Sequence, residues 1–252
     1  MWACLVLALS HIHEQGVIHR DFKPDNIMID NKGYPKIVDF GVADFEKDIA
    51  YGSHFGTLSY MAPEMVLCEP YSYSIDFYSL GVLILLILTG DMFAVGKTVE
   101  EARKHVLKRR RTLTMKKLKK RYPFLSNEWV DFLYKLLQGH PQDRLGSKSG
   151  IWEIKNHHWL MNIPWKELEN KSYPSPFIKF VENYKNKKTI GESHYIGLNK
   201  RDLALKEKED KALENVGKVI SNEQDTDNSL YDNFHEFMKM NVNLIEEEIA
   251  YE

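Results

Sequence analysis

Apolar residues at the start of the chain recur close to every 3.6 positions, which predicts a helix over residues 1–15. The apolar positions are Trp2, Leu5, Val6, Ala8, Leu9 and Ile12. We expect Gly16 to end this helix, because glycine commonly lies just past a helix C-terminus. Two short apolar runs follow, Ile27–Asp30 and Lys36–Asp39. The Asn and Gly between them suit a turn, so the two runs predict a β-hairpin.

The middle of the chain changes from a loop pattern to a strongly apolar one. Residues 39–64 hold few apolar positions at either period, which indicates an extended loop. Residues 74–89 are apolar on every side and predict a helix that is buried all round. Ser126 indicates the start of another helix, which ends near Gly139, and residues 152–159 predict a short one. The pattern predicts an α+β fold, mostly α, with one small β-hairpin.

The chain becomes polar and rich in Lys, Glu and Asn beyond Phe180. Residues 199–219 predict a helix in this part. We expect residues 221–229 to be disordered, because a segment with so little apolar surface cannot form a packed core.

Composition limits the classes of protein to consider. With 252 residues the chain can form one large or two small domains. Its net charge of −2 predicts no dominant attraction to nucleic acid or to an anionic membrane. Cys4 and Cys68 are the two cysteines, which favours a reducing, cytoplasmic location without disulfides. The apolar run Leu80–Leu88 is about half of what a membrane span needs, so we expect no span.

Basic residues are concentrated in one stretch, Lys104–Arg121, which holds ten Lys or Arg among eighteen residues. We interpret it as the solvated face of a helix. A nucleic-acid or phospholipid patch is the alternative, but no aromatic residues are interleaved with the charges, as they are in many single-strand binders.

Polar residues that suit catalysis lie at both ends of the predicted hairpin. Residues 19–26 read His-Arg-Asp-Phe-Lys-Pro-Asp-Asn, and residues 39–41 read Asp-Phe-Gly. A tight hairpin would hold Asp21 and Asn26 close to Asp39. Carboxylate and amide oxygens gathered in this way suit Mg²⁺, which proteins bind through one or two carboxylates together with substrate phosphates.

These two motifs resemble the catalytic loop and the metal-binding loop of eukaryotic protein kinases, H-R-D-L-x-x-x-N followed by D-F-G, with Phe22 in place of Leu. The resemblance implies transfer of the ATP γ-phosphoryl group to protein hydroxyls. It implies that Asp21 is the catalytic base and that Lys23 lies beside the transferred group. The remaining implied ligands are Asn26 and Asp39 for Mg²⁺, and Met28 as a floor for the adenine of ATP.

Residues 56–64, Gly-Thr-Leu-Ser-Tyr-Met-Ala-Pro-Glu, resemble the end of a kinase activation segment. In that family Thr57 would bridge the catalytic Asp and Lys, which favours serine/threonine over tyrosine specificity. Ser53 occupies the place where kinases of the AGC group, which includes the cyclic-nucleotide-dependent kinases, are phosphorylated by an activating kinase. A phosphate there would pair with Arg20 and order the loop.

The same resemblance assigns supporting roles to residues outside the loop. Asp76 would bind backbone amides of the catalytic loop and anchor a spine of side chains through His19 and Phe40. Arg144, in Asp-Arg-Leu-Gly, would pair with Glu64 and hold the activation segment to the helical lobe.

The resemblance divides the chain into a kinase C-lobe at residues 1–160 and an AGC-type C-terminal tail, partly disordered, at residues 161–252. Phe234-His235-Glu236-Phe237 has the spacing of that tail's hydrophobic motif. No Gly-rich loop or Val-Ala-x-Lys strand precedes His19. We therefore expect a C-lobe without its N-lobe, incomplete at the N-terminus, monomeric, and inactive alone.

Two other functions remain open at this point. One is a non-catalytic half-kinase that docks substrates or partners through its helical lobe. The other is a small-molecule phosphotransferase, such as the kinase-like antibiotic kinases, which share an Asp and an Asn at similar spacing. The segment Ala62-Pro63-Glu64 together with Asp76 and Arg144 argues against the latter, because these residues brace a segment that binds peptides.

Overall fold

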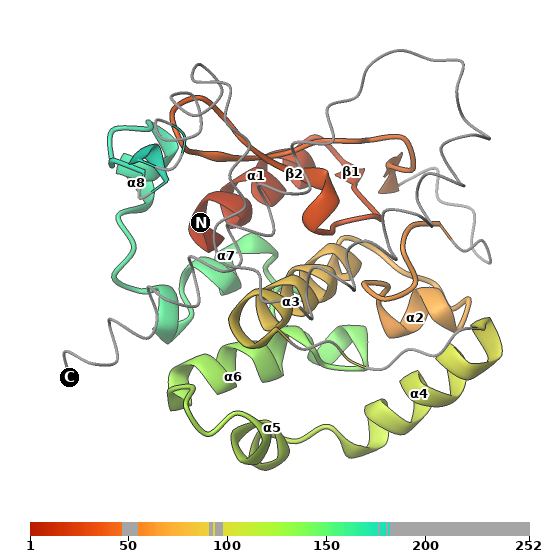
Figure 1. The fold of residues 1–252 in the computed structure, drawn as a ribbon. Helices are drawn as coiled ribbons and strands as arrows, with labels where there is room; N and C mark the ends of the chain where they lie inside the picture. Colours follow the sequence, from red (N-terminus) through yellow and green to blue (C-terminus); the bar gives the residue numbers. More distant parts are fainter. Residues whose placement is uncertain (47–54, 91–92, 94–97, 176, 180, 182–252) are drawn as a thin grey trace, which may run out of the picture.

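The computed structural model describes residues 1–46, 55–90, 93, 98–175, 177–179 and 181. Helices make up most of this part, and its strands form two antiparallel sheets of two strands each. Figure 1 shows the strands along one edge of the molecule, α3 through its centre, and α4, α5 and α6 along the opposite edge. None of the helices in these residues is both long and apolar enough to cross a bilayer.

The N-terminal helix and the hairpin form as the hydrophobic pattern predicts. Helix α1 spans Trp2–Glu14 and buries Leu5, Val6 and Leu9. Strands β2 (Ile27–Ile29) and β3 (Pro35–Ile37) pair in register, with Ile27 opposite Ile37. Helix α1 packs against β3 and so holds the hairpin to the core.

A second sheet corrects the expectation of a single hairpin. Strand β1 (Val17–Ile18) pairs with β4 (Asp44–Phe45), and Val17 lies opposite Phe45. Each strand has two residues, too few for a period-2 pattern to be recognised. The pairing fastens the beginning of the 39–64 segment to the end of α1.

Gly33 lies in the turn of the β2–β3 hairpin with a φ of 83°, a conformation that favours glycine. A Cβ at this position would lie 2.8 Å from Ser175 Oγ and 2.9 Å from the backbone nitrogen of Ile178. The Ser175 hydroxyl donates a hydrogen bond to the Gly33 carbonyl, at 2.6 Å. The segment after α8 therefore packs directly on the hairpin turn.

Helix α3 (Ser74–Thr89) is the buried helix that its uniformly apolar sequence predicts. Thirteen of its sixteen residues are buried, so it is surrounded by other elements. Gly81 permits a close approach to α6, because a Cβ there would lie 2.9 Å from Leu136 Cβ. Helix α3 ends at Gly90, which has a φ of 63°.

The described residues hold six further α-helices, of which α6 packs against α3. They are α2 (Pro63–Val66), α4 (Val99–Thr112), α5 (Met115–Arg121), α6 (Asn127–Leu136), α7 (Ile151–Lys155) and α8 (Trp165–Glu169). The described residues also hold short 3₁₀ helices at Pro24–Asn26, Pro141–Asp143 and His158–Leu160. The Ser126 hydroxyl caps α6 as predicted, by accepting a hydrogen bond from the Trp129 amide at 3.3 Å.

The single helix predicted at residues 152–159 is instead two short pieces, α7 and the 3₁₀ helix His158–Leu160. His157 separates them, because its ring Nδ1 accepts a hydrogen bond from the Trp159 amide and starts the second piece. The helix predicted at 199–219, the disorder at 221–229, the Phe234–Phe237 motif and most of the expected tail at 161–252 lie outside the described residues.

Candidate active site

Three residues of the predicted site, Lys23, Asn26 and Thr57, meet at Asp21. The Thr57 amide donates to Asp21 Oδ1 at 2.7 Å, and Lys23 Nζ lies 2.9 Å from Asp21 Oδ2. Asn26 Nδ2 donates to the same Oδ2 at 3.1 Å, and Lys23 Nζ donates to Thr57 Oγ1 at 2.9 Å. The bridge from Thr57 to the aspartate and the lysine, which the sequence resemblance implied, is therefore present.

This setting keeps the Asp21 carboxylate ionised. Burial acts to raise its pKa, but hydrogen bonds from Lys23 and from the Thr57 hydroxyl and amide outweigh burial, so the pKa lies below its usual value. A buried carboxylate with a fixed orientation can accept a hydrogen bond from an incoming hydroxyl group. That is the geometry that a general base needs.

Gly56 permits the contact between Thr57 and Asp21. Its φ is 91°, and a Cβ would lie 2.4 Å from the Arg20 carbonyl oxygen and 3.2 Å from Asp21 Oδ1. The backbone of the 56–64 segment can thus approach the catalytic loop at this point only with glycine. The sequence pattern did not single out this residue.

We expect Gly56→Ala to lower the free energy of unfolding by at least about 1 kcal/mol, because alanine is strained at this φ and its Cβ would contact Arg20. Gly90→Ala is the matched control, since Gly90 also has a positive φ but a Cβ there would meet nothing within 4 Å. Urea denaturation measures both changes. Equal losses would show that the close approach at Gly56 contributes nothing.

Asn26 and Asp39 lie next to each other across the start of the hairpin. The Val38 amide donates to the Asn26 carbonyl at 2.9 Å, which places Asp39 one residue beyond this bond. Asn26 Nδ2 donates hydrogen bonds to the Asp21 carbonyl, at 2.8 Å, and to the Asp21 carboxylate. The side-chain oxygen of Asn26 therefore remains available for another partner. Asp39 is exposed and has a φ of 60°, a conformation that side-chain-bearing residues rarely adopt outside functional sites.

The donor set of these two residues fits Mg²⁺. It offers one carboxylate and one amide oxygen, and Mg²⁺ usually completes its octahedron with waters and substrate phosphates. No cluster of three or more His, Cys, Asp or Glu side chains suited to a metal occurs among the described residues. The described residues therefore do not form the closed set of side-chain ligands that a structural metal site requires.

Asp76, at the start of α3, holds the catalytic loop through its backbone. Its carboxylate accepts hydrogen bonds from the amides of His19, at 2.9 Å, and Arg20, at 3.0 Å. These are the contacts that the sequence resemblance implied. A third donor, the ring Nε2 of His13 at 2.8 Å, comes from α1 and was not predicted. The carboxylate thus joins α1, α3 and the catalytic loop.

The ring of His19 is oriented by two further contacts. Its Nε2 donates to the Val38 carbonyl at 3.1 Å, which leaves Nδ1 as the acceptor for the Asp21 amide at 3.3 Å. The Phe40 ring lies 5.1 Å from the His19 ring but is 46% exposed. The expected contact between the two side chains is present, and one side of Phe40 remains open.

Arg20 has several partners within the described residues. Its guanidinium donates to the carbonyls of Val42, at 2.5 Å, and Ala43, at 3.4 Å. It also pairs with Asp44 at 3.3 Å and lies over the Phe55 ring at 4.5 Å. Ser53, the expected phosphate-bearing partner, lies outside the described residues. Its modification remains a prediction.

The expected ion pair between Glu64 and Arg144 is present and completely buried. The guanidinium binds both carboxylate oxygens, at 2.6 and 2.9 Å, and both side chains are 0% exposed. Arg144 also donates to the carbonyls of Ser74, at 2.8 Å, and Gln138, at 3.1 Å. These bonds tie α2, in which the 56–64 segment ends, to α3 and to the residues just after α6.

Met28 lies in β2 opposite Lys36 and is 37% exposed. Its apolar side chain is accessible, as a floor for adenine would have to be. No contact within the described residues tests that role, which remains a prediction.

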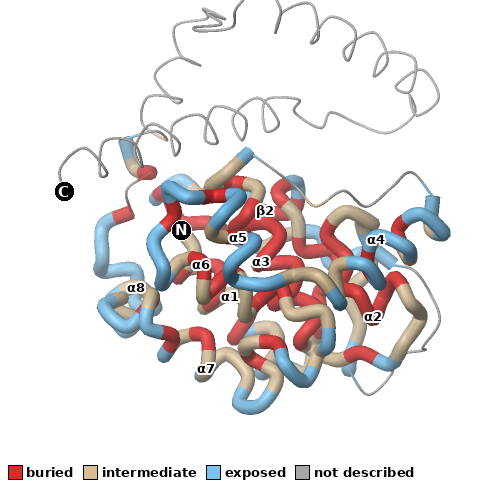
Figure 2. Tube along the Cα trace, turned by 90° about the horizontal axis from the view of Figure 1, so that it is seen from below, coloured by how far each residue is buried: buried red, intermediate tan, exposed pale blue. Residues whose placement is uncertain are grey.

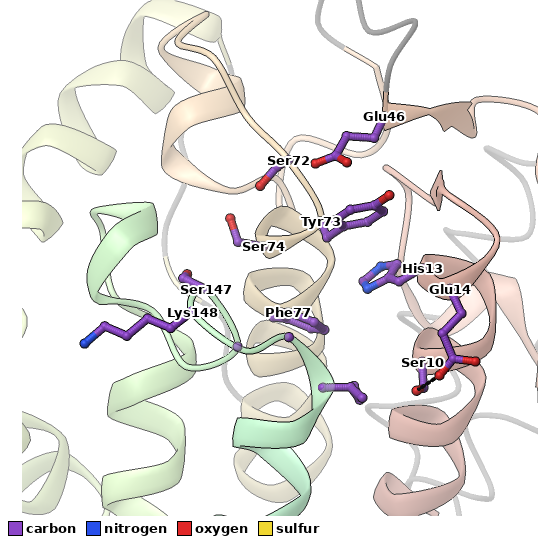
Figure 3. A pocket seen from close by; sticks show the side chains of 13 residues that line it. Ser10, His13, Glu14, Glu46, Ser72, Tyr73, Ser74, Phe77, Ser147 and Lys148 are labelled. Carbon is purple, nitrogen blue, oxygen red and sulfur yellow. Dashed lines mark hydrogen bonds between the residues drawn. The ribbon is translucent and has the colours of Figure 1, made fainter.

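A cavity of about 420 Å³ lies away from Asp21, between α1, the start of α3 and the 146–151 loop. Figure 3 shows His13, Glu14 and Ser10 on one side, Tyr73 and Phe77 in the centre, and Ser147 and Lys148 on the other side. Burial and a hydrogen bond with Glu46 raise the pKa of Tyr73. The cavity is connected to the catalytic loop through His13, which contacts Asp76.

Comparison with known proteins agrees with this geometry. The chain is 40% identical over 176 residues to the serine/threonine-protein kinase AtPK1/AtPK6 of Arabidopsis thaliana, covering 69% of this chain and 36% of that protein. It is 36% identical over 179 residues to cGMP-dependent protein kinase 2 of Homo sapiens, covering 69% and 22%. Ribosomal protein S6 kinase alpha-6 of Homo sapiens is 40% identical over 177 residues, covering 69% and 22%.

The chain thus spans between about a fifth and just over a third of the length of these relatives. The model of the protein kinase domain matches residues 1–160, which is more than half of the chain. This stretch includes the Asp21 cluster, the Asn26 and Asp39 pair and the Glu64–Arg144 ion pair. The chain therefore belongs to the protein kinase domain family.

Proposed function

We propose that this chain supplies the catalytic base and the metal ligands of a serine/threonine protein kinase. The observation that carries the proposal is the fixed Asp21 carboxylate, which Lys23, Asn26 and the Thr57 amide contact from three directions. Phosphoryl transfer requires mainly positioning and charge neutralisation, with little covalent chemistry by the protein. The cluster around Asp21 offers both.

Each residue has a defined part in the reaction. Bound Mg·ATP supplies the phosphoryl group and the cation that offsets its charge. Asp21 orients the substrate hydroxyl and takes its proton. Lys23, held between Asp21 and Thr57, contributes a positive charge beside the transferred group. Asn26 and Asp39 would hold Mg²⁺ through their side-chain oxygens.

The arrangement of the 56–64 segment favours a protein substrate over a small molecule. Thr57 contacts the base, and three residues further along the Tyr60 carbonyl accepts a hydrogen bond from Ser79 of α3 at 2.8 Å. Glu64 and Arg144 then fix the end of the segment. A braced segment beside the base is suited to hold an extended peptide. Relatives that include a cGMP-dependent kinase support placement in the AGC group.

Exposed apolar side chains lie on the strands and loops next to the catalytic residues. They are Met28, Phe40, Phe45 and Phe55, with exposures of 37, 46, 50 and 39%. Large apolar side chains left open near a site mark a surface that another structure covers. We propose that the second wall of the nucleotide site covers them and comes from outside the described residues.

The 252-residue chain alone is therefore expected to phosphorylate peptides no faster than its Asp21→Asn variant, because the described residues provide only one wall of the ATP site. Transfer of labelled phosphate from Mg·ATP to a mixture of Ser and Thr peptides measures this. Turnover of the unchanged chain clearly above that of the variant would contradict the proposal that the ATP site needs a second wall.

A fusion separates an incomplete kinase from a non-catalytic docking module. In this fusion the part of AtPK1/AtPK6 that precedes its matched region is joined to residue 1 of this chain. If the chain is an incomplete kinase, we expect the fusion to phosphorylate peptides and this activity to depend on Asp21. If the fusion unfolds cooperatively and binds ATP but transfers no phosphate, the docking module is the better description.

A further inference from the structure

The helices α4 and α5 carry an unusual concentration of positive charge. The sequence has no Asp or Glu from residue 102 to residue 127. Figure 1 shows the two helices following one another along the edge opposite the strands, and Figure 2 looks at the molecule from that side. Six exposed basic residues define what we call the α4–α5 cationic face: Lys104, Lys108, Arg111, Lys116, Lys117 and Lys120.

The other basic residues of these helices have structural partners. Arg103 donates to the Val66 carbonyl at 3.2 Å. Arg109 donates to the Tyr78 hydroxyl at 2.8 Å, and Arg110 binds both carboxylate oxygens of Glu69. Lys119 donates to the Leu125 carbonyl. Arg121, the last residue of α5, lies over the Tyr122 ring at 5.6 Å. Packing of the fold accounts for these five residues, whereas no hydrogen bond or ion pair within the described residues involves the side chains of the α4–α5 cationic face.

Several charges of the face lower the stability of their own helices. Lys104 and Lys108 are four residues apart, and so are Lys116 and Lys120, and like charges at this spacing repel. Lys116 and Lys117 lie in the first turn of α5, which has no acidic residue, where cations oppose the helix dipole. Lys104 gains from Glu100 four residues before it, and Arg111 and Lys120 lie in last turns, where cations favour the dipole. Lys108, Lys116 and Lys117 gain nothing of this kind, and an external anion would relieve their repulsion.

Apolar side chains are interspersed with these charges. Leu107, directly before Lys108, is 43% exposed, and Met115, directly before Lys116, is 39% exposed. Phe124, just beyond α5, is 54% exposed. In α4 the residues Lys104, Leu107 and Lys108 follow the helical spacing of one face, opposite the buried Ala102 and Val106.

Cations mixed with exposed aliphatic residues on a helix face fit an anionic bilayer. Lysines near such a surface gain electrostatic energy, and aliphatic side chains enter the headgroup region. Nucleic acid would reward the charges, and Phe124 could stack on a base, but Leu107 and Met115 would gain little, since apolar contacts to nucleic acid are made mainly by stacked aromatic rings. We propose that the α4–α5 cationic face binds this protein peripherally to membranes rich in anionic phospholipid. This inference does not depend on the proposed kinase activity.

The test uses the full 252-residue chain and sedimentation with vesicles of phosphatidylcholine and phosphatidylserine at about 3:1, at an ionic strength of about 0.1 M. We expect binding to these vesicles and none to pure phosphatidylcholine. Each lysine near an anionic surface contributes roughly fivefold. The triple variant Lys116→Gln, Lys117→Gln, Lys120→Gln should therefore lower the partition coefficient by about a hundredfold.

The matched control replaces three exposed lysines elsewhere by glutamine: Lys32, Lys148 and Lys166. It changes the net charge equally and should keep vesicle binding within about twofold, because these lysines lie outside the face. The α5 triple variant should melt close to the unchanged chain, since the repulsion that it removes offsets the loss of Lys120 from the last turn, which excludes unfolding as the cause of lost binding. A second variant, Leu107→Gln with Met115→Gln, should weaken binding while leaving its salt dependence unchanged.

Three results would overturn the proposal. One is absence of binding to phosphatidylserine vesicles. Another is an equal loss in the control triple variant, which would assign binding to overall charge. The third is tighter binding to nucleic acid than to the vesicles, measured with a DNA duplex of about 20 base pairs and a single-stranded RNA of about 20 nucleotides. This result would assign the face to nucleic acid.

Discussion

Glu64→Gln is expected to lower the free energy of unfolding by roughly 3–5 kcal/mol, because it leaves the buried Arg144 guanidinium without a counter-charge. The cation has no route to solvent, since its side chain is 0% exposed. The carbonyls of Ser74 and Gln138 satisfy part of its hydrogen-bonding capacity but carry no net charge. Urea denaturation of the full chain, followed by circular dichroism, measures the loss.

Glu69→Gln is the matched control. Glu69 also binds an arginine, Arg110, through both oxygens, but its side chain is 43% exposed. Its loss should therefore cost less than about 1 kcal/mol. The double variant Glu64→Leu, Arg144→Met should regain much of the stability, because it removes both buried charges together. If Glu64→Gln costs no more than Glu69→Gln, the buried pair does not hold the segment.

Asp21→Asn in the active fusion is expected to reduce kcat by roughly 10²–10⁴-fold, the usual contribution of a general base. The asparagine oxygen can still accept the Thr57 amide, but it cannot take the hydroxyl proton, and its NH2 group would face two other donors, Lys23 Nζ and Asn26 Nδ2. The KM for ATP should change little, since the proposed nucleotide and metal contacts involve other residues. Initial rates at varied ATP and peptide concentrations measure both quantities.

Asp143→Asn serves as the control for Asp21→Asn. Asp143 is exposed in the 3₁₀ helix Pro141–Asp143, far along the chain from the catalytic loop. Its replacement makes the same chemical change and should leave kcat unaltered. Retention of more than about a third of the activity in Asp21→Asn would remove Asp21 from the role of base.

Elements with a strong local pattern were predictable from the sequence. The residues of α3 are apolar throughout, and the Asn and Gly between β2 and β3 are turn residues, so both elements could be recognised. The β1–β4 pairing joins two-residue strands that are far apart in the chain. The break at His157 depends on a side-chain cap inside an otherwise helical pattern. Neither leaves a periodic signal.

In the candidate site too, residues within local motifs could be predicted, whereas contacts between distant residues could not. Motif spacing pointed to Asp21, Asn26 and Asp39, because these residues lie close together in sequence or across one hairpin. His13 was missed, since its bond to Asp76 spans 63 residues and its position in a helix has no distinguishing feature. Gly56 was missed because its need for glycine arises from the nearby Arg20 carbonyl, which is a tertiary contact.

Net charge was a poor guide to the surface. A total of −2 describes the chain as nearly neutral, while residues 102–127 contain no acid at all. Averaging over the chain hides the α4–α5 cationic face, because acidic residues elsewhere offset it. The distribution of charge over exposed helix faces is what decides peripheral binding.

The hydrogen bonds of Asp76 also bear on the order in which the molecule folds. The amides of His19 and Arg20 bond to a carboxylate that follows them by 57 and 56 residues, on a helix that is itself buried. Closing so long a loop costs chain entropy before the bonds can form. The catalytic loop therefore takes its final shape only after α3 has docked. The same two amides exchange their hydrogens with water only when α3 separates from the loop, so their exchange rates report the opening of the lobe's centre.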